Sequence, residues 1–302
     1  MKMLPSLVQP GHPDFDQLDL IRRGLERIAG GARVIKTAFP LAIRDAIDFV
    51  LDPIRTGRTE IRELDNVEKT FVGLKIEHYV RDFLHAPKGL RDLVIGGQDV
   101  DIKNTLDNSW MIPPETYRDE GPCLVVNSKE DESLCWMGLL LARDAYLNAP
   151  NRDGKRGVKS GAVSHVLWLV EGAPYPPSVW RSFDMGEFRA LREMQPGTAR
   201  AAEFFRRNIG IEVPRAVTEA LLFDQKDPMK RLRGNQGARD MLKPEGIALL
   251  SGAFGQTVLR ALGRPQIASD AFIAITPATE REREILLAKG AIEIPAQSTF
   301  LL

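Results

Sequence analysis

The chain has 302 residues, 43% of them hydrophobic and 27% charged, as expected for a globular protein of two compact domains or one large one. Basic and acidic residues balance at 41 each, so the total charge gives no sign of a nucleic-acid partner and any basic surface must be local. The two cysteines exclude a disulfide framework or a zinc cluster and suit a reducing cytoplasm. No apolar run resembles a secretion signal or could span a bilayer, so we expect a cytoplasmic protein without a membrane partner.

The first half of the sequence predicts helices followed by strands. Apolar residues recur at helical spacing over Ala42–Leu51 and again over Val67–Leu84, so both segments should pack one face on a core. Two short segments, Leu90–Ile95 and Asp99–Thr105, then flank a Gly-Gly pair, which is typical of a β-hairpin. Together with the apolar block Leu134–Ala142, they predict an α/β domain around a central sheet.

A domain boundary is predicted where three prolines fall in four positions, Pro174–Pro177, because such a run resists both helix and central strand. We therefore predict a first domain over residues 1–168, a proline-rich linker over 169–177 and a second domain over 178–302. The second domain should be mainly helical. Its helix candidates are Gly186–Met194, Gly197–Arg207, Val213–Phe223 and Asp227–Asn235.

Acidic residues and a lysine gather around the predicted hairpin. On a strand, Asp99, Asp101 and Lys103 share one face while the two residues between them enter the core. If Asp92 lies on the opposing strand, its carboxylate approaches that of Asp101, giving two hard oxygen ligands for one divalent cation. With a lysine beside them, this set is suited to phosphodiester hydrolysis, in which the metal polarises the phosphate and the lysine helps to orient water.

Each of these residues also has a plainer interpretation. Asp92 could be a charge at a strand edge, and Asp101 with Lys103 a solvated pair on one face. Glu77, on the preceding helix, could complete the metal shell as a third acid or be a helix surface residue. The spacing alone leaves these alternatives open.

The ordered set Glu77, Asp92, Asp101 and Lys103 matches the PD-(D/E)xK nuclease pattern, with Arg91 in place of the signature's proline, which is not a ligand. Short words around it resemble the NaeI-like type II restriction endonucleases and follow in collinear order over most of the chain. These words are Glu68-Lys69-Thr70, Gln98–Lys103, Trp110–Glu115, Met137-Gly138-Leu139, Asn151-Arg152-Asp153, Met229-Lys230-Arg231, Gly237-Ala238-Arg239 and Pro244–Ile247.

The resemblance implies a homodimer that belongs to a restriction–modification system and cuts double-stranded DNA at a GC-rich palindrome. Its first domain would have the α/β/α endonuclease fold with a central mixed sheet and use Mg²⁺. Asp92 and Asp101 would bind the metal, and Lys103 and Glu77 would join them in catalysis. Its second domain would resemble the helix-turn-helix unit of the catabolite activator protein and bind a second DNA site as an activator.

Candidate DNA-binding residues form a basic cluster in the second half. Arginine and asparagine side chains can pair with base edges in the major groove, and lysine can neutralise phosphates. The cluster consists of Lys230, Arg231, Arg233, Asn235 and Arg239. The alternative is a solvated helix face. For the basic stretch Arg152–Lys159, a flexible linker is preferred over a phosphate contact.

Two other functions remain open at this point. One is a two-domain DNA-binding regulator without catalytic activity, which would require that the acids be used in salt bridges. The other is a repair nuclease that nicks DNA with the same acids but has no second sequence-reading domain.

Overall fold

A five-stranded mixed sheet forms the centre of the first of two units into which the chain divides. The computed structural model describes residues 2–106, 109–233 and 235–293. The first unit comprises Met1–Asp52 and Arg58–Ser178, and the second comprises Pro53–Gly57 and Val179–Leu302. Each unit is described by itself below.

The central sheet has the strand order β1-β2-β4-β5-β8, in which only β2 and β4 run parallel. Its strands are β1 (Leu93–Ile95), β2 (Gln98–Thr105), β4 (Pro122–Lys129), β5 (Leu134–Leu141) and β8 (Leu167–Pro174). The predicted hairpin is confirmed as β1 and β2, and so are the mixed central sheet and the α/β class. β4 and β5 are buried along almost their whole length, as expected for strands covered on both faces.

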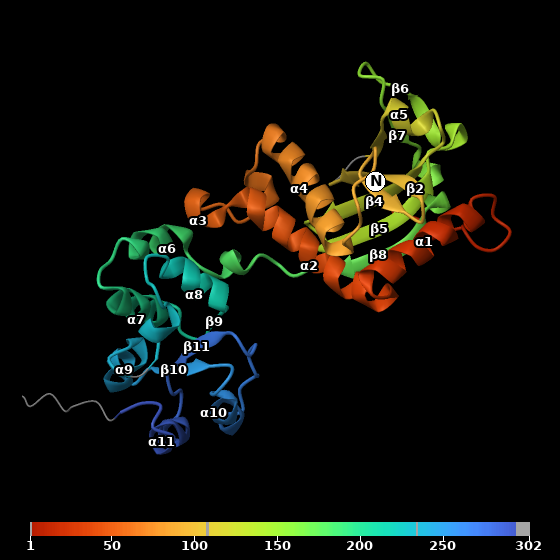
Figure 1. The fold of residues 1–302 in the computed structure, drawn as a ribbon. Coiled ribbons are helices and arrows are strands. Elements are labelled where there is room, and N and C mark those ends of the chain that lie inside the picture. The colour runs from red at the N-terminus through yellow and green to blue at the C-terminus, as the bar shows by residue number, and fades with distance from the viewer. Residues whose placement is uncertain (1, 107–108, 234, 294–302) are drawn as a thin grey trace, which may run out of the picture. The chain divides into compact units, whose positions relative to one another are not determined.

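Three helices lie along one face of this sheet (Figure 1): α1 (Phe15–Ala29), α2 (Ala32–Leu51) and α4 (Asn66–Leu84). Asp65 caps the N-terminus of α4, and its carboxylate accepts hydrogen bonds from the amides of Val67 and Glu68. Its buried residues, among them Ile76 and Val80, share a core cluster with apolar side chains of the sheet. The two helices predicted for this part of the chain are confirmed, although α2 begins ten residues earlier than expected.

The opposite face of the sheet is covered by a second, three-stranded sheet. Its order is β3-β7-β6, from β3 (Met111–Ile112), β6 (Leu147–Pro150) and β7 (Arg156–Val158). The remaining elements of the first unit are short: α5 (Pro114–Tyr117) and the 3-10 turns Ile61–Glu63, Asp144–Tyr146 and Ser160–His165. Within the described residues, the third layer of the expected α/β/α arrangement is therefore mostly β-structure. The buried Cys123 packs in this layer as a small apolar residue.

Two segments expected to be linkers are ordered parts of the first unit. Residues 169–174 of the predicted linker belong to β8, which pairs with β5. The strand tolerates Pro174 because this residue lies at its end and β8 is an edge strand of the sheet. The stretch Arg152–Lys159 is the turn and second strand of the β6–β7 hairpin. Asn151 holds this turn by accepting from the amides of Asp153 and Lys155 at 3.0 and 2.9 Å.

The second unit combines short helices with a three-stranded antiparallel sheet in the order β10-β11-β9. Its elements are α3 (Pro53–Thr56), α6 (Met185–Arg192), α7 (Gly197–Arg207), β9 (Glu212–Val213), α8 (Arg215–Leu221), α9 (Ala238–Leu242), β10 (Ala248–Ser251), α10 (Gln256–Ala261), β11 (Phe272–Ile275) and α11 (Glu280–Ala288), with 3-10 turns at Val179–Ser182, Met229–Arg231 and Lys243–Glu245. None of the helices in the described ranges is long and apolar enough to cross a membrane.

The prediction of a helix over Asp227–Asn235 is wrong for the residues that the structure describes. Residue 234 lies outside them. Only one 3-10 turn forms there. Asn235 and Gln236 have φ angles of 62° and 69°, in the left-handed region that ends a helix. Gly237 follows, and a Cβ at this position would overlap the carbonyl of Arg233, so the chain must turn here at a glycine.

The close approach of β5 and β8 gives a test of the fold. A Cβ on Gly138 would lie 2.8 Å from the Trp168 ring and 3.0 Å from the Leu167 carbonyl oxygen. We expect Gly138→Ala to lower the free energy of unfolding by about 2 kcal/mol, because the strands cannot move apart without losing ladder hydrogen bonds. Gly157→Ala is the matched control, since its Cβ would meet only ordinary contacts of 3.4 Å or more. Denaturant titration of both variants measures the difference, and equal stabilities would contradict the packing described.

Candidate active site

The turn between β1 and β2 sets the geometry of the acidic site. Gly96 and Gly97 adopt φ angles of 58° and 79°, so a two-residue turn joins the strands. This turn pairs Ile95 with Gln98 and Leu93 with Val100. One step further in the same register, Asp92 comes opposite Asp101, and its proximity contributes to raising the pKa of Asp101. Asp92 Oδ2 also accepts from the Ile102 amide at 2.8 Å.

Asp101 is buried and its partner Lys103 is partly buried, so the two do not form a solvated surface pair. Asp101 is only 4% exposed, and its Oδ1 accepts from Lys103 Nζ at 2.5 Å. The same ammonium donates to the Ile102 carbonyl at 3.0 Å. Burial raises the pKa of Asp101, although the Lys103 charge opposes this. Burial by itself would lower the pKa of Lys103, but the surrounding carboxylates outweigh it and raise that pKa, so the lysine stays charged.

Thr116 completes the environment of Asp101. This residue lies on α5 and is fully buried, and its hydroxyl donates to Asp101 Oδ2 at 2.7 Å. Both oxygens of the carboxylate are therefore engaged, one by an ammonium and one by a hydroxyl. The surroundings of Asp101 come from three separate segments: β2, the end of the loop before β1, and α5.

Glu77 faces the same group of charges from α4. Burial raises its pKa to about 7, with Lys103 opposing the shift and the two aspartates adding to it. Glu77 is therefore not simply a solvated helix residue, because the electrostatic effect of all three hairpin residues reaches it. A carboxyl group with a pKa near 7 changes its charge in the range where enzymes work.

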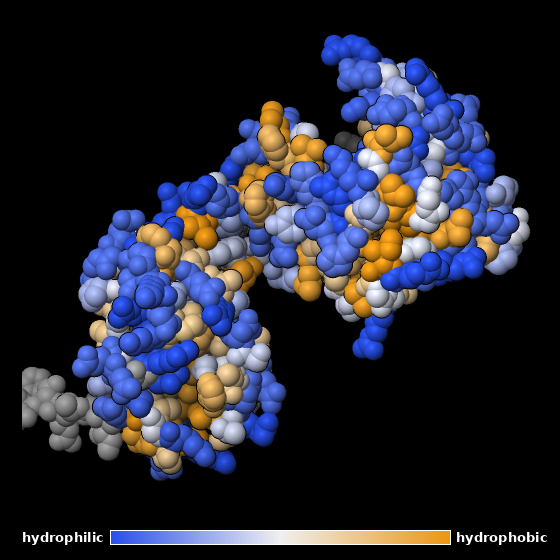
Figure 2. Space-filling model, viewed as in Figure 1, coloured by the Kyte–Doolittle hydropathy of each residue, from blue (hydrophilic) through white to orange (hydrophobic). Residues whose placement is uncertain are grey.

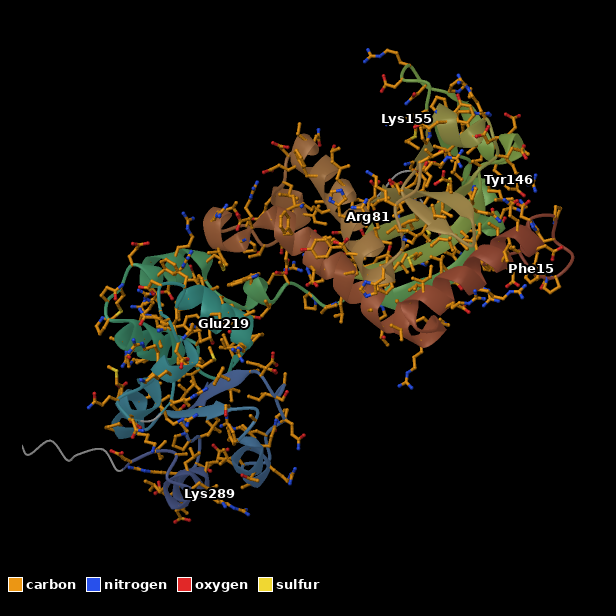
Figure 3. The ribbon with its side chains drawn as sticks, in the orientation of Figure 1. Phe15, Arg81, Tyr146, Lys155, Glu219 and Lys289 are labelled. Atoms are coloured by element: carbon orange, nitrogen blue, oxygen red, sulfur yellow. The ribbon has the colours of Figure 1, made fainter. Side chains whose placement is uncertain are left out.

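Glu77 and Lys103 line a cleft of about 620 Å³ within the first unit. One wall is the exposed side of α4, with Lys69, Thr70 and Glu77, and the floor includes Lys103. The opposite wall includes Met111 and Pro113 from the small sheet, together with Lys155 on the β6–β7 turn. Figure 3 labels Lys155 on this hairpin and Arg81 on α4. The hairpin carries hydrophilic side chains on the face shown in Figure 2.

The donor atoms suit a divalent cation, although they are not arranged around one. Among the residues that the structure describes, no three His, Cys, Asp or Glu side chains stand together in a metal-binding arrangement. The reason is that Lys103, Thr116 and the Ile102 amide hold the oxygens of Asp101 and Asp92. Yet the atoms nearest the Lys103 ammonium are a carboxylate and a carbonyl oxygen, which are the hard donors that Mg²⁺ prefers.

The residues of the basic cluster in the second unit differ in their exposure to solvent. Lys230, Arg231, Arg233 and Asn235 are exposed, and in the described part of the chain the three cations make no ion pair within 4 Å. Arg239 differs, because it is half-buried and donates through Nε to the Leu249 carbonyl at 3.0 Å. Burial lowers the pKa of Arg239. Four of the five candidates are thus available on the surface.

Sequence reasoning missed several side chains that the fold brings to the site. Thr116 is the clearest, and Lys69 and Lys155 line the cleft walls. Thr116 follows directly on the segment Trp110–Glu115, which carried part of the resemblance, but nothing in the local pattern shows that its hydroxyl reaches Asp101. Lys155 lay in a stretch interpreted as a linker, and only its hairpin places it beside α4.

The raised pKa of Glu77 gives a test in metal-free protein. An acid whose pKa is raised on folding contributes stability at low pH that is lost as pH rises through the folded-state value of about 7. We expect the wild type to match Glu77→Gln near pH 4.5 and to fall about 2 kcal/mol below it by pH 8. Unfolding titrations in EDTA measure this difference, with Glu132→Gln on the β4–β5 turn as the surface control. Parallel curves for wild type and Glu77→Gln would show that Glu77 is solvated.

Comparisons with known proteins show the family to which the chain belongs. The model of the family "Restriction endonuclease NaeI" matches residues 36–286, which is most of the chain. The type II restriction enzyme NaeI of Lentzea aerocolonigenes is 34% identical over 218 residues, covering 69% of this chain and 68% of that enzyme. The match includes both the acidic hairpin and the basic segment of the second unit. The chain therefore belongs to the NaeI family of restriction endonucleases.

Proposed function

We propose that the first unit cleaves double-stranded DNA by Mg²⁺-dependent hydrolysis of a phosphodiester bond. The observation that carries this proposal is that Glu77 and Lys103 line one cleft, and that Lys103 binds Asp101, which lies opposite Asp92 on the β1–β2 hairpin. Asp92 and Asp101 would hold the metal, and Glu77 would be the additional acid. When bound, the cation polarises the scissile phosphate and lowers the pKa of a bound water.

The residues of the chain itself supply charge and orientation. Lys103 stays protonated beside Asp101, so its ammonium can donate to the attacking water or to a phosphate oxygen and balance the developing negative charge. The protonated form of Glu77 limits the repulsion among three neighbouring carboxyl groups below pH 7. Above that pH its carboxylate is available as a ligand or as an acceptor for a water proton.

The cleft walls fit a DNA backbone. Lys69 on α4 and Lys155 on the β6–β7 turn line opposite sides, and neither forms an ion pair within the described ranges. Two such lysines can neutralise phosphates on either side of the scissile bond, while Thr70 and Asn66 can donate or accept hydrogen bonds there. For Lys155 we therefore propose the phosphate contact that was the less favoured of the two interpretations of Arg152–Lys159 from sequence.

Digestion of a defined plasmid tests the catalytic assignment. We expect the wild type to cut with Mg²⁺ and not in EDTA, and Asp101→Asn or Lys103→Ala to cut at least about a hundredfold more slowly, because each removes a charge used in the transition state. DNA binding measured by gel shift in Ca²⁺ should persist in both variants. The control is Asp131→Asn on the β4–β5 turn, which should cut normally. Sequencing the ends identifies the site, for which we propose a GC-rich palindrome.

An intact plasmid after prolonged incubation of wild type with Mg²⁺ would instead support a DNA-binding regulator, since the Lys103–Asp101 pair would then serve only the fold. Cutting by Asp101→Asn at the wild-type rate would show that the acid is structural.

For the second unit we propose a helix-turn-helix that binds a second DNA site. The order α7, β9, α8, α9, β10, α10, β11 places short helices beside one antiparallel sheet of β9, β11 and β10, and this combination supports the proposal. The exposed Lys230, Arg231, Arg233 and Asn235 lie between α8 and α9, where they can reach phosphates and base edges. Arg239 would support α9 through its bond to Leu249.

We further propose that the enzyme acts as a homodimer. A palindromic duplex has a two-fold axis, and two copies of one active site cut both strands at equivalent positions. DNA bound to the second unit would act as an effector if that state favours the cleavage-competent conformation.

A time course on a single-site plasmid tests the effector role. We expect a short cognate duplex to accelerate cleavage about 5- to 150-fold, as coupling of 1–3 kcal/mol implies. Neutralising Arg231 and Arg233 together with glutamine should reduce this stimulation and the salt dependence of binding, because fewer counterions are released. Replacing Arg281 and Arg283 on α11 with glutamine is the matched control. Equal rates with and without the duplex would leave a nuclease with one DNA site.

A further inference from the structure

Arg91 stands where the nuclease signature has proline, and it bridges two segments around the active site. Its Nη2 donates to the Glu115 carbonyl at 2.7 Å and pairs with Asp119 at 3.1 Å. Its Nη1 donates to the Asp99 carbonyl on β2 at 3.4 Å. The guanidinium therefore joins α5 and the residues after it to the strand that carries Asp101.

The Arg91 guanidinium occupies space that a side chain at position 121 would fill, and this space is free because residue 121 is glycine. It packs directly over Gly121, where a Cβ would lie 2.6 Å from Nη1. The Arg91 side chain is only 16% exposed, so its charge is largely removed from water. A flat, forked cation is suited to binding a carbonyl and a carboxylate on different segments at once.

The short helix that Arg91 holds also carries Thr116. Thr116 Oγ1 donates to Asp101 Oδ2 at 2.7 Å, and the Thr116 carbonyl accepts from the Gly121 amide at 2.9 Å. Thr116 and Asp101 are both buried, so no water can replace the hydroxyl without rearrangement. Oδ2 is thereby turned toward α5, and Oδ1 is left to Lys103 on the cleft side.

We propose that Thr116 is a positioning residue for Asp101 and that Arg91 acts through it, by holding α5 against β2. The inference rests on the proposed role of Asp101 as a metal ligand. A ligand carboxylate fixed by a hydrogen bond on its far oxygen binds a cation without first having to be oriented, and loss of such a partner weakens metal binding about 10- to 100-fold. At the position of the signature proline, Arg91 thus holds α5 against β2.

Replacement of Thr116 separates the hydrogen bond from packing. Thr116→Val keeps the shape and removes the donor, whereas Thr116→Ser keeps the donor. We expect Thr116→Val to weaken Ca²⁺ binding, measured by calorimetry on the DNA-bound full chain, by about tenfold or more. The Mg²⁺ concentration for half-maximal cleavage should rise in proportion, with a smaller change in the rate at saturating Mg²⁺. Thr116→Ser should restore both values to within about twofold of the wild type.

Two further variants complete the experiment. Thr218→Val is the matched control, because Thr218 is fully buried in the second unit and its hydroxyl has no hydrogen-bond partner within the described residues. It should leave Ca²⁺ binding unchanged. Arg91→Lys, which keeps the charge but loses the fork, should weaken Ca²⁺ binding in the same direction as Thr116→Val.

Thermal unfolding in EDTA shows which variants are folded and so can be interpreted. A folded Thr116→Val that binds Ca²⁺ as the wild type does would overturn the inference. So would a Thr116→Ser that is as impaired as Thr116→Val. These outcomes differ from failure of the proposed function, in which Asp101→Asn itself would keep Ca²⁺ binding and cleavage.

Discussion

The site depends on one local constraint, the two-residue turn at Gly96 and Gly97. Both residues adopt positive φ angles, so the turn fixes the register of β1 on β2. A slip of one residue would turn every side chain of one strand to the other face. In the observed register, Asp92 and Asp101 meet on one face while Val100 and Ile102 enter the core. A backbone conformation that glycine adopts without strain thus brings two carboxyl groups together despite their mutual repulsion.

Burial then determines how these charges behave. Asp101 is almost completely removed from water, and such a group is tolerated only with partners that satisfy both of its oxygens. Lys103 and Thr116 provide them. The same low exposure raises the pKa of Glu77 to about 7, so the site can hold three acids close together at neutral pH. The network that stabilises the resting site therefore also sets its protonation.

The second unit shows how a neutral chain can still present local positive charge. Several of its arginines are used within the fold: Arg200 is fully buried against Asp224, and Arg206 pairs with Glu245. The exposed cations between α8 and α9 have no such partners among the described residues. The 41 basic and 41 acidic residues balance over the whole chain, but the arginines used in these ion pairs and the cations left at the surface belong to different segments. The charge of the whole chain therefore says little about its partners.

Sequence by itself determined the hairpin, the amphipathic helix of Glu77 and the family, because turn chemistry, residue periodicity and collinear words are local properties of the chain. It could not determine that Asp101 would be buried, that Thr116 would donate to it, or that Lys155 would line the cleft opposite α4. The sequence also predicted a linker where the proline-rich end of β8 lies, because the pairing of this strand with β5 is not visible in the local pattern. These features depend on which segments meet across the sheet, and burial, hydrogen-bond partners and pKa shifts exist only once those segments are packed together.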